Sequence, residues 1–160
     1  MHTYSLCDKI IKAGINTNII FTRRYFLNLI VCLDNRNGMM FGGRRQSRDK
    51  LLCERVMALT TGKLYMSEYS AKIFPESEKI VACGDYLTAA GKNDYCFCEE
   101  PPITLENSEK IIIYRWNRHY PADRHFHFDL EELGYELAST EEFIGNSHPT
   151  ITEQIYKKVR

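Results

Sequence analysis

The chain has 160 residues, 44% of them hydrophobic, which fits one compact domain with a sizeable core. Its 21 basic and 21 acidic residues cancel, so no general charge draws it to nucleic acid or to an anionic membrane. No apolar run is long enough to span a membrane, and the N-terminus lacks the continuous apolar core of a signal peptide.

Residues 1–26 differ from the rest of the chain. They form a weakly amphipathic, isoleucine-rich segment that ends at Arg23-Arg24. We expect an N-terminal extension here, either a short helix or a disordered stretch. A single domain is expected over residues 27–160.

The predicted domain opens with a buried strand at residues 29–33, closed by the turn residues Asp34 to Gly38. A glycine-containing loop follows. Ser47 is then expected to cap a helix that runs to about Thr61. The stripe of this helix that we expect to be buried holds Leu51, Leu52, Val56 and Leu59.

The later elements alternate between strands and helices and then end in strands. Ser67 is expected to cap a brief helix that Pro75 stops, and a second short helix is expected at residues 85–90. This order predicts an α/β protein with a mixed sheet whose C-terminal strands are antiparallel. The other expected strands are 64–66, 79–82, 94–98, 110–116, 124–128, 135–139 and 150–156.

The six cysteines lie mostly inside apolar runs, and no Cys-x-x-Cys occurs. A free thiol in such a run behaves as a small hydrophobic side chain. We therefore expect reduced thiols and a cytoplasmic protein.

The segment from Asp123 to Asp129 contains His-x-His-x-Asp, which resembles the metal-binding signature of the metallo-β-lactamase hydrolases, including ribonuclease Z. That motif has a further His after the Asp, where this chain has Leu130. A catalytic zinc also needs three protein ligands, and few residues remain to supply them. We therefore expect no metal, and interpret the segment as a strand with its phenylalanines inward and His125 and His127 toward solvent.

From Leu29 onward, the order of features resembles dihydrofolate reductase. That family has an acidic residue early in its first helix, where it hydrogen-bonds the pterin ring, and Asp49 takes the corresponding place. The family's Met-Gly-Arg is matched by Met66-Ser67-Glu68, and its Asp-Thr-x-Phe by Asp123-Arg124-His125-Phe126. The resemblance spans most of residues 29–158 and implies a dihydrofolate-reductase-like three-layer α/β fold.

The resemblance implies a ligand cleft but a degraded cofactor site. Glu68 stands where the family presents Arg to the cofactor phosphate, and Glu99-Glu100 stand where Gly-Gly approaches the pyrophosphate. We therefore expect no NADPH and no hydride transfer. Arg124 stands where the family has the Thr that supports the pterin-binding acid. The implied ligand-binding residues are Asp49, Met66, Tyr69 and Arg124.

Two simpler interpretations stand beside this one. Asp49 also fits an exposed aspartate favoured by the dipole of a helix N-terminus. The basic residues Arg44, Arg45 and Arg48 adjoin a Gly-Gly loop and could hold a phosphate, although loop charges are more often simply solvated.

Binding of a small ligand or a protein partner is the predicted function, and whether the chain is an enzyme stays open. One alternative is a ribonuclease or hydrolase that uses His119, His125 and His127, with or without a metal. Another is an RNA-binding module on the Arg115–Arg124 stretch, where cations alternate with aromatics. No Cys or Ser shows a His/Asp partner pattern in the sequence.

Overall fold

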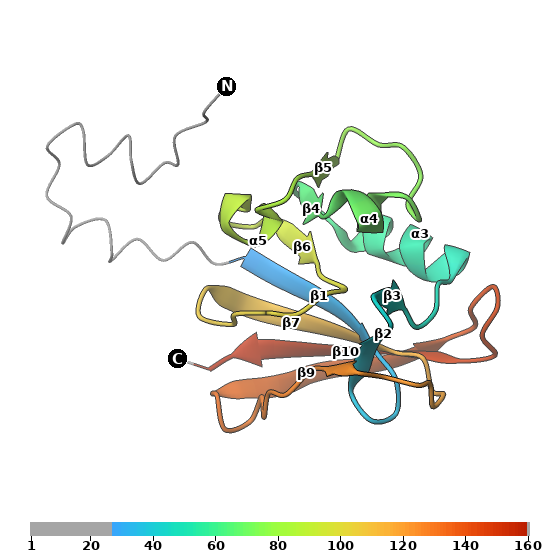
Figure 1. Cartoon of the computed structure of the whole chain (residues 1–160). Helices are drawn as coiled ribbons and strands as arrows, with labels where there is room; N and C mark the ends of the chain where they lie inside the picture. The colour runs from blue at the N-terminus through green and yellow to red at the C-terminus, as the bar shows by residue number, and fades with distance from the viewer. Residues whose placement is uncertain (1–26, 160) are drawn as a thin grey trace, which may run out of the picture.

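The computed structural model describes residues 27–159, which form a seven-stranded sheet with the order β5-β4-β6-β1-β7-β10-β9 (Figure 1). The central strand β1 (Leu27–Leu33) pairs in parallel with β6 (Tyr95–Phe97) and β7 (Ser108–Arg115). β10 (Ile151–Lys158) is antiparallel to β7 and to β9 (Tyr135–Phe143). The predicted mixed sheet with antiparallel C-terminal strands is confirmed, while the predicted extension at 1–26 lies outside the described residues.

The other half of the sheet is parallel, with β4 (Leu64–Met66) between β5 (Ile80–Ala82) and β6. A second, three-stranded sheet has the order β3-β2-β8. Its members are β2 (Gly38–Phe41), β3 (Arg44–Arg45) and β8 (Arg124–His125). The hairpin of β2 and β3 falls where the sequence predicted only a loop.

One face of the main sheet is covered by α3 (Lys50–Leu59), with α4 (Glu68–Ala71) beside it (Figure 1). The residues of α3 buried there are Leu52, Cys53 and Val56. Leu51, predicted to be buried, is 39% exposed because the buried stripe runs along the Leu52 side of the helix. The helix also begins later than predicted, with Asp49 rather than Ser47 as its N-cap.

The opposite face is covered by α5 (Tyr86–Ala89) and by the segment that follows β8. Alternate residues of β1 enter the two cores: Leu29 and Val31 on this face, Ile30 on the α3 face. Two packed faces around one sheet give three layers, as predicted.

The strand expected at 124–128 is shorter than predicted. Only Arg124 and His125 pair with β2, and beyond them the backbone amide of Phe126 donates to the carbonyl oxygen of Asn37 at 2.8 Å. Phe126 is buried and His127 exposed, so their predicted orientations hold outside a regular strand.

Two general features complete the fold. Between residues 27 and 159, no helix has the length and apolar character needed to cross a membrane. The five cysteines of this region are all free thiols, as expected.

Candidate functional site

Asp49 is the most heavily bonded carboxylate of the site. As the N-cap of α3 it accepts hydrogen bonds from the amides of Leu51 and Leu52, at 3.0 and 3.3 Å. From the loop between β9 and β10 it also accepts the amides of Asn146 and Ser147, at 2.9 and 2.8 Å. The carboxylate therefore joins two segments that lie about a hundred residues apart in the chain.

Burial alone would raise the pKa of Asp49. The hydrogen bonds from the Asn146 amide, the His148 ring and the Ser147 and Leu52 amides outweigh it, and the pKa lies well below its usual range. Asp49 is only 3% exposed, so the interpretation as an exposed helix-terminal aspartate is wrong. The amino-acid sequence contains no local signal for the β9–β10 loop, which covers Asp49.

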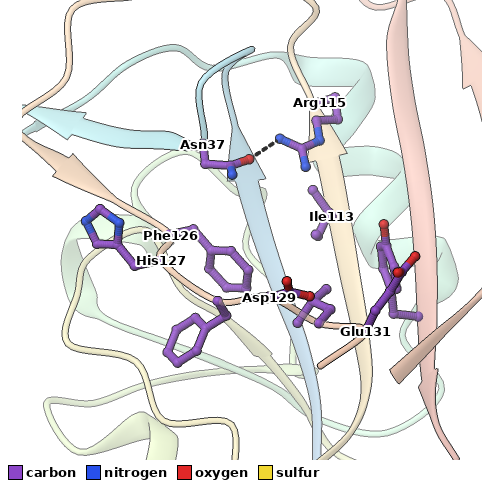
Figure 2. A pocket seen from close by; sticks show the side chains of 10 residues that line it. Asn37, Ile113, Arg115, Phe126, His127, Asp129 and Glu131 are labelled. Atoms are coloured by element: carbon purple, nitrogen blue, oxygen red, sulfur yellow. Dashed lines mark hydrogen bonds between the residues drawn. The ribbon is translucent and has the colours of Figure 1, made fainter. Parts of the chain in front are cut away.

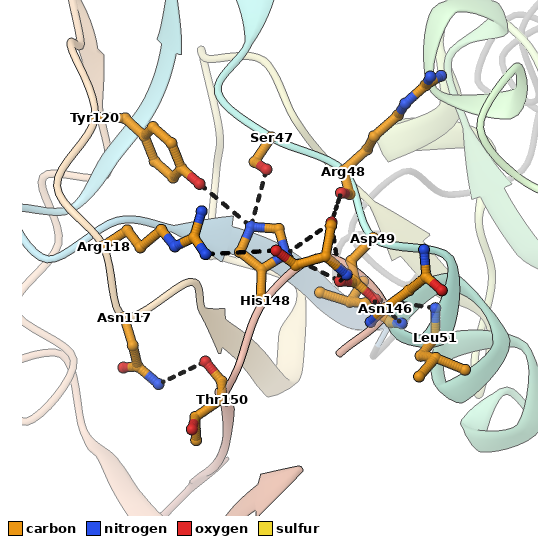
Figure 3. A network of polar contacts seen from close by, with 12 residues as sticks. Ser47, Arg48, Asp49, Leu51, Asn117, Arg118, Tyr120, Asn146, His148 and Thr150 are labelled. Atoms are coloured by element: carbon orange, nitrogen blue, oxygen red, sulfur yellow. Dashed lines mark hydrogen bonds and ion pairs between the residues drawn. The ribbon is translucent and has the colours of Figure 1, made fainter. Parts of the chain in front are cut away.

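His148 makes polar contacts at both of its ring nitrogens, as Figure 3 shows. Its Nδ1 lies 2.9 Å from Asp49 Oδ2, and its ring stacks on Trp116 with centroids 4.6 Å apart. At the other end of the ring, Nε2 lies 2.9 Å from Ser47 Oγ and 3.2 Å from Tyr120 Oη. The residue is 3% exposed.

These contacts bring Ser47, His148 and Asp49 into a linear array, which corrects the expectation that no Ser has a His/Asp partner. The sequence hid the array because His148 lies 101 residues after Ser47 and 99 after Asp49. Such arrays are defined by geometry and not by spacing.

A second buried carboxylate, Asp34, accepts hydrogen bonds from residues on both sides of this array. Its Oδ2 accepts from Gln46 Nε2 at 3.0 Å and from the Tyr120 amide at 3.2 Å. Its Oδ1 accepts the amides of Arg36 and Gly38, both at 2.8 Å. Asp34 thus fixes the residue before Ser47 and the backbone of Tyr120.

Glu99, at the carboxyl end of β6, forms a third buried centre. Arg45 of β3 binds it with both Nε and Nη2, at 2.9–3.2 Å, and Ser70 Oγ donates to it at 2.8 Å. The Arg45 guanidinium also lies 4.0 Å from the ring centroid of Tyr69. The expected negative charge of Glu99 is therefore balanced locally by Arg45, while Glu100 beside it is exposed.

A pocket of about 440 Å³ opens beside Asp49. It lies between the start of α3, the end of α4 and the β9–β10 loop. Three of its six lining side chains are cationic and none is acidic. The lining residues are Arg48, Lys50, Lys72, Ile73, Asn146 and Ser147.

A different pocket, of about 450 Å³, lies on the other face of the sheet (Figure 2). Phe126, Ile113 and Leu130 give it apolar walls, and its polar lining carries both signs of charge, including Arg115 and Asp129. Arg115 is hydrogen-bonded to Asn37, Gln154 and the backbone of Asp34. This pocket offers no single charge preference.

The residues that the resemblance assigned to one cleft have different surroundings in the structure. Met66 is fully buried in the core, and Tyr69 packs on Arg45. Arg124 is exposed and pairs through its backbone with Met40. His148, and not Arg124, is the side chain that supports Asp49. The ligand-binding roles of these four residues stay predictions.

The histidine segment and the cation–aromatic stretch also have clear positions. The rings of His125 and His127 lie 5.5 Å apart, and residues 27–159 contain no group of three His, Cys, Asp or Glu that could hold a metal. In the predicted RNA-binding stretch Arg115–Arg124, Trp116 is buried and so is closed to base stacking, while Tyr120 is partly exposed.

Comparison with solved structures gives a match to dihydrofolate reductase from Enterococcus faecalis, described as complexed with NADP(H) and RAB-propyl. The TM-score is 0.57 and the sequence identity 8%, over 86% of this chain and 98% of that one. No family model and no curated protein matches the sequence. The chain therefore has a dihydrofolate-reductase-like fold, as the resemblance implied, with a strongly divergent sequence.

Proposed function

We propose that this chain binds a small anionic ligand on a reductase-like scaffold and carries out no NADPH-dependent hydride transfer. The observation that carries the proposal is the pocket that Arg48, Lys50 and Lys72 line and that no acidic side chain lines. In a chain of zero net charge, three cations around one concave site give a local preference for anions.

The amides at the start of α3 add little to this preference. Helix N-termini commonly bind anions, but here the amides of Leu51 and Leu52 already donate to Asp49. Selectivity for the anion would come from the Arg and Lys side chains, with Asn146 and Ser147 as polar neighbours. Asp49 does not line this pocket, and its oxygens already accept backbone amides, so the proposed anion site lies beside Asp49 and not on it.

The absence of hydride chemistry is supported by the side chains at the end of β6. Open α/β sheets bind nucleotides outside the carboxyl ends of their strands, where the backbone must come close to the pyrophosphate. Here Glu99, Arg45 and Ser70 fill this position with a bonded side-chain cluster. Glu68 adds an exposed negative charge at the start of α4.

Cytoplasmic localisation also belongs to the proposal, supported by the free thiols.

Ribonuclease activity at His119, His125 and His127 remains the alternative. Elemental analysis tests its metal-dependent form: stoichiometric zinc that disappears in His125→Ala would favour it.

Inorganic pyrophosphate is the probe for the anion pocket. We expect saturable binding by calorimetry that weakens about five- to tenfold in Lys72→Ala and weakens with added salt. Lys92→Ala removes an equally exposed lysine outside the pocket and is expected to bind as the wild type does. Equal effects of the two variants, or no binding at millimolar pyrophosphate, would contradict the proposal.

A further inference from the structure

The array of Ser47, His148 and Asp49 has the contacts required of an activated serine. Ser47 Oγ lies 2.9 Å from His148 Nε2, and His148 Nδ1 lies 2.9 Å from Asp49 Oδ2 (Figure 3). Each distance is that of a direct hydrogen bond. The three residues therefore form a chain of hydrogen bonds from a nucleophile, Ser47, through a base, His148, to an orienting carboxylate, Asp49. Nucleophilic catalysis by serine uses this arrangement.

The charge state of Asp49 sets the tautomer of the ring. Its hydrogen bonds keep the carboxylate ionised, so Nδ1 of a neutral His148 carries the proton that points to it. Nε2 is then left as the acceptor facing Ser47. The stacking of Trp116 holds the ring plane in this orientation.

The nucleophile is accessible while its base is sheltered. Ser47 lies in the loop between β3 and α3 and is partly exposed, whereas His148 is 3% exposed. Ser47 is therefore the more exposed end of the array, from which a substrate and then a water molecule would approach Nε2.

A donor for a developing oxyanion lies close by. Tyr120 Oη is 3.2 Å from Nε2, the same atom that Ser47 contacts, so both hydroxyl groups lie within hydrogen-bond distance of one ring nitrogen. Asp34 fixes both sides of this site, through Gln46 and through the Tyr120 amide. Asp34 is thus a positioning residue and Tyr120 the candidate oxyanion donor.

We propose that Ser47 is a catalytic nucleophile and that the chain cleaves small carboxylic esters. Ser47 Oγ bonds to the carbonyl carbon while His148 Nε2 takes the hydroxyl proton. The bond to the leaving alcohol breaks, and His148 protonates the departing oxygen. Water, deprotonated by His148, then hydrolyses the acyl-serine and restores the hydroxyl.

This activity goes beyond anion binding and uses different atoms. The pocket lined by Lys50 and Lys72 lies on the Asp49 side of the array, while Ser47 is at the Nε2 end. If pyrophosphate does not bind, the proposal that Ser47 is a nucleophile still stands. If Ser47 is not labelled, the proposal of an anion-binding pocket still stands.

The test is labelling of the whole chain with a fluorophosphonate, followed by mass spectrometry after digestion with a protease that spares arginine. We expect one adduct, on Ser47, and a burst of p-nitrophenol from p-nitrophenyl acetate. Ser47→Ala should abolish both, whereas Ser139→Ala, an exposed serine on β9, should change neither.

His148→Gln and Tyr120→Phe separate catalysis from structure. We expect labelling to slow about 100-fold or more in His148→Gln and to a lesser degree in Tyr120→Phe, which keeps the aromatic packing. If His148→Gln does not fold, Tyr120→Phe and Ser47→Ala still decide. An unlabelled folded wild type, an adduct on another serine, or unchanged labelling in Tyr120→Phe and His148→Gln would overturn the proposal.

Discussion

At the scale of single residues, the negative charges of two buried carboxylates are stabilised by different kinds of partner. Glu99 is paired with a cation, Arg45, whereas Asp49 is held mainly by neutral amides and a histidine. A paired buried charge loses most when its partner is removed, because the remaining charge stays desolvated. An amide-held charge loses its stabilisation when it is protonated.

For the first case, Arg45→Ala leaves Glu99 buried without its cation. We expect the free energy of unfolding in urea to fall by about 3–5 kcal/mol. The neighbouring Arg44 is exposed on the same short strand, so Arg44→Ala serves as the control and should change stability by less than about 0.5 kcal/mol. Similar losses in both variants would show that the Arg45–Glu99 pair is unimportant.

For the second case, Asp49→Asn is expected to lower the free energy of unfolding by about 2–4 kcal/mol at pH 7. The pKa of Asp49 is depressed on folding. Its contribution is therefore complete above the unfolded pKa of about 4 and is lost as the pH falls below that value. Urea unfolding at pH 7 and pH 3 should show the gap to the wild type narrowing in acid.

The matched control for this pH dependence is Asp85→Asn. Asp85 is also a helix N-cap, of α5, but its side chain makes no capping hydrogen bond. We expect little change at either pH. A gap between Asp49→Asn and wild type that widens toward pH 3 would contradict the assignment of Asp49 as an ionised, amide-held carboxylate.

At the scale of elements, local patterns predicted the long strands and helices well. The apolar run that became β1 and the isoleucines of β7 fixed the centre of the sheet. The β2–β3 hairpin was missed because it is short, turns at Gly42-Gly43 and pairs with the distant β8. Asp49, and not Ser47, caps the helix because its side chain accepts the amides of Leu51 and Leu52, while the Ser47 hydroxyl contacts His148.

The β9–β10 loop is expected to tolerate no added bulk at Gly145. A Cβ there would meet Asp49 Oδ2 at 2.6 Å and Ile151 Cδ1 at 2.9 Å. Gly145→Ala should therefore lower the melting temperature by several degrees, for a cost of about 1–3 kcal/mol. Gly84→Ala, where a Cβ meets nothing within 4 Å, should melt like the wild type. Equal melting of the two variants would show that the loop does not seat on Asp49 as described.

At the scale of the whole molecule, the sequence predicted the fold class through the order of its features. It did not predict the site, because Ser47 and Asp49 meet His148 only after the last two strands pair. Fold class depends on local periodicity and element order, whereas this site depends on contacts across about a hundred residues. No spacing rule in the sequence describes such contacts. The sequence therefore indicated Asp49 as a site residue but not its partner His148.

The whole molecule also shows that a fold and a proposed activity are separate questions. The fold is dihydrofolate-reductase-like, yet fold alone does not determine activity. The side chains at the end of β6 and the cations around Arg48 favour an anion-binding protein over a hydride-transfer enzyme.

Titration with NADPH by calorimetry, with dihydrofolate then added and absorbance followed at the NADPH band, tests this central claim most directly. We expect no saturable heat and no oxidation of NADPH. Saturable NADPH binding with dihydrofolate-dependent oxidation would show that the Arg45–Glu99–Ser70 cluster leaves the cofactor site open, and would contradict the account.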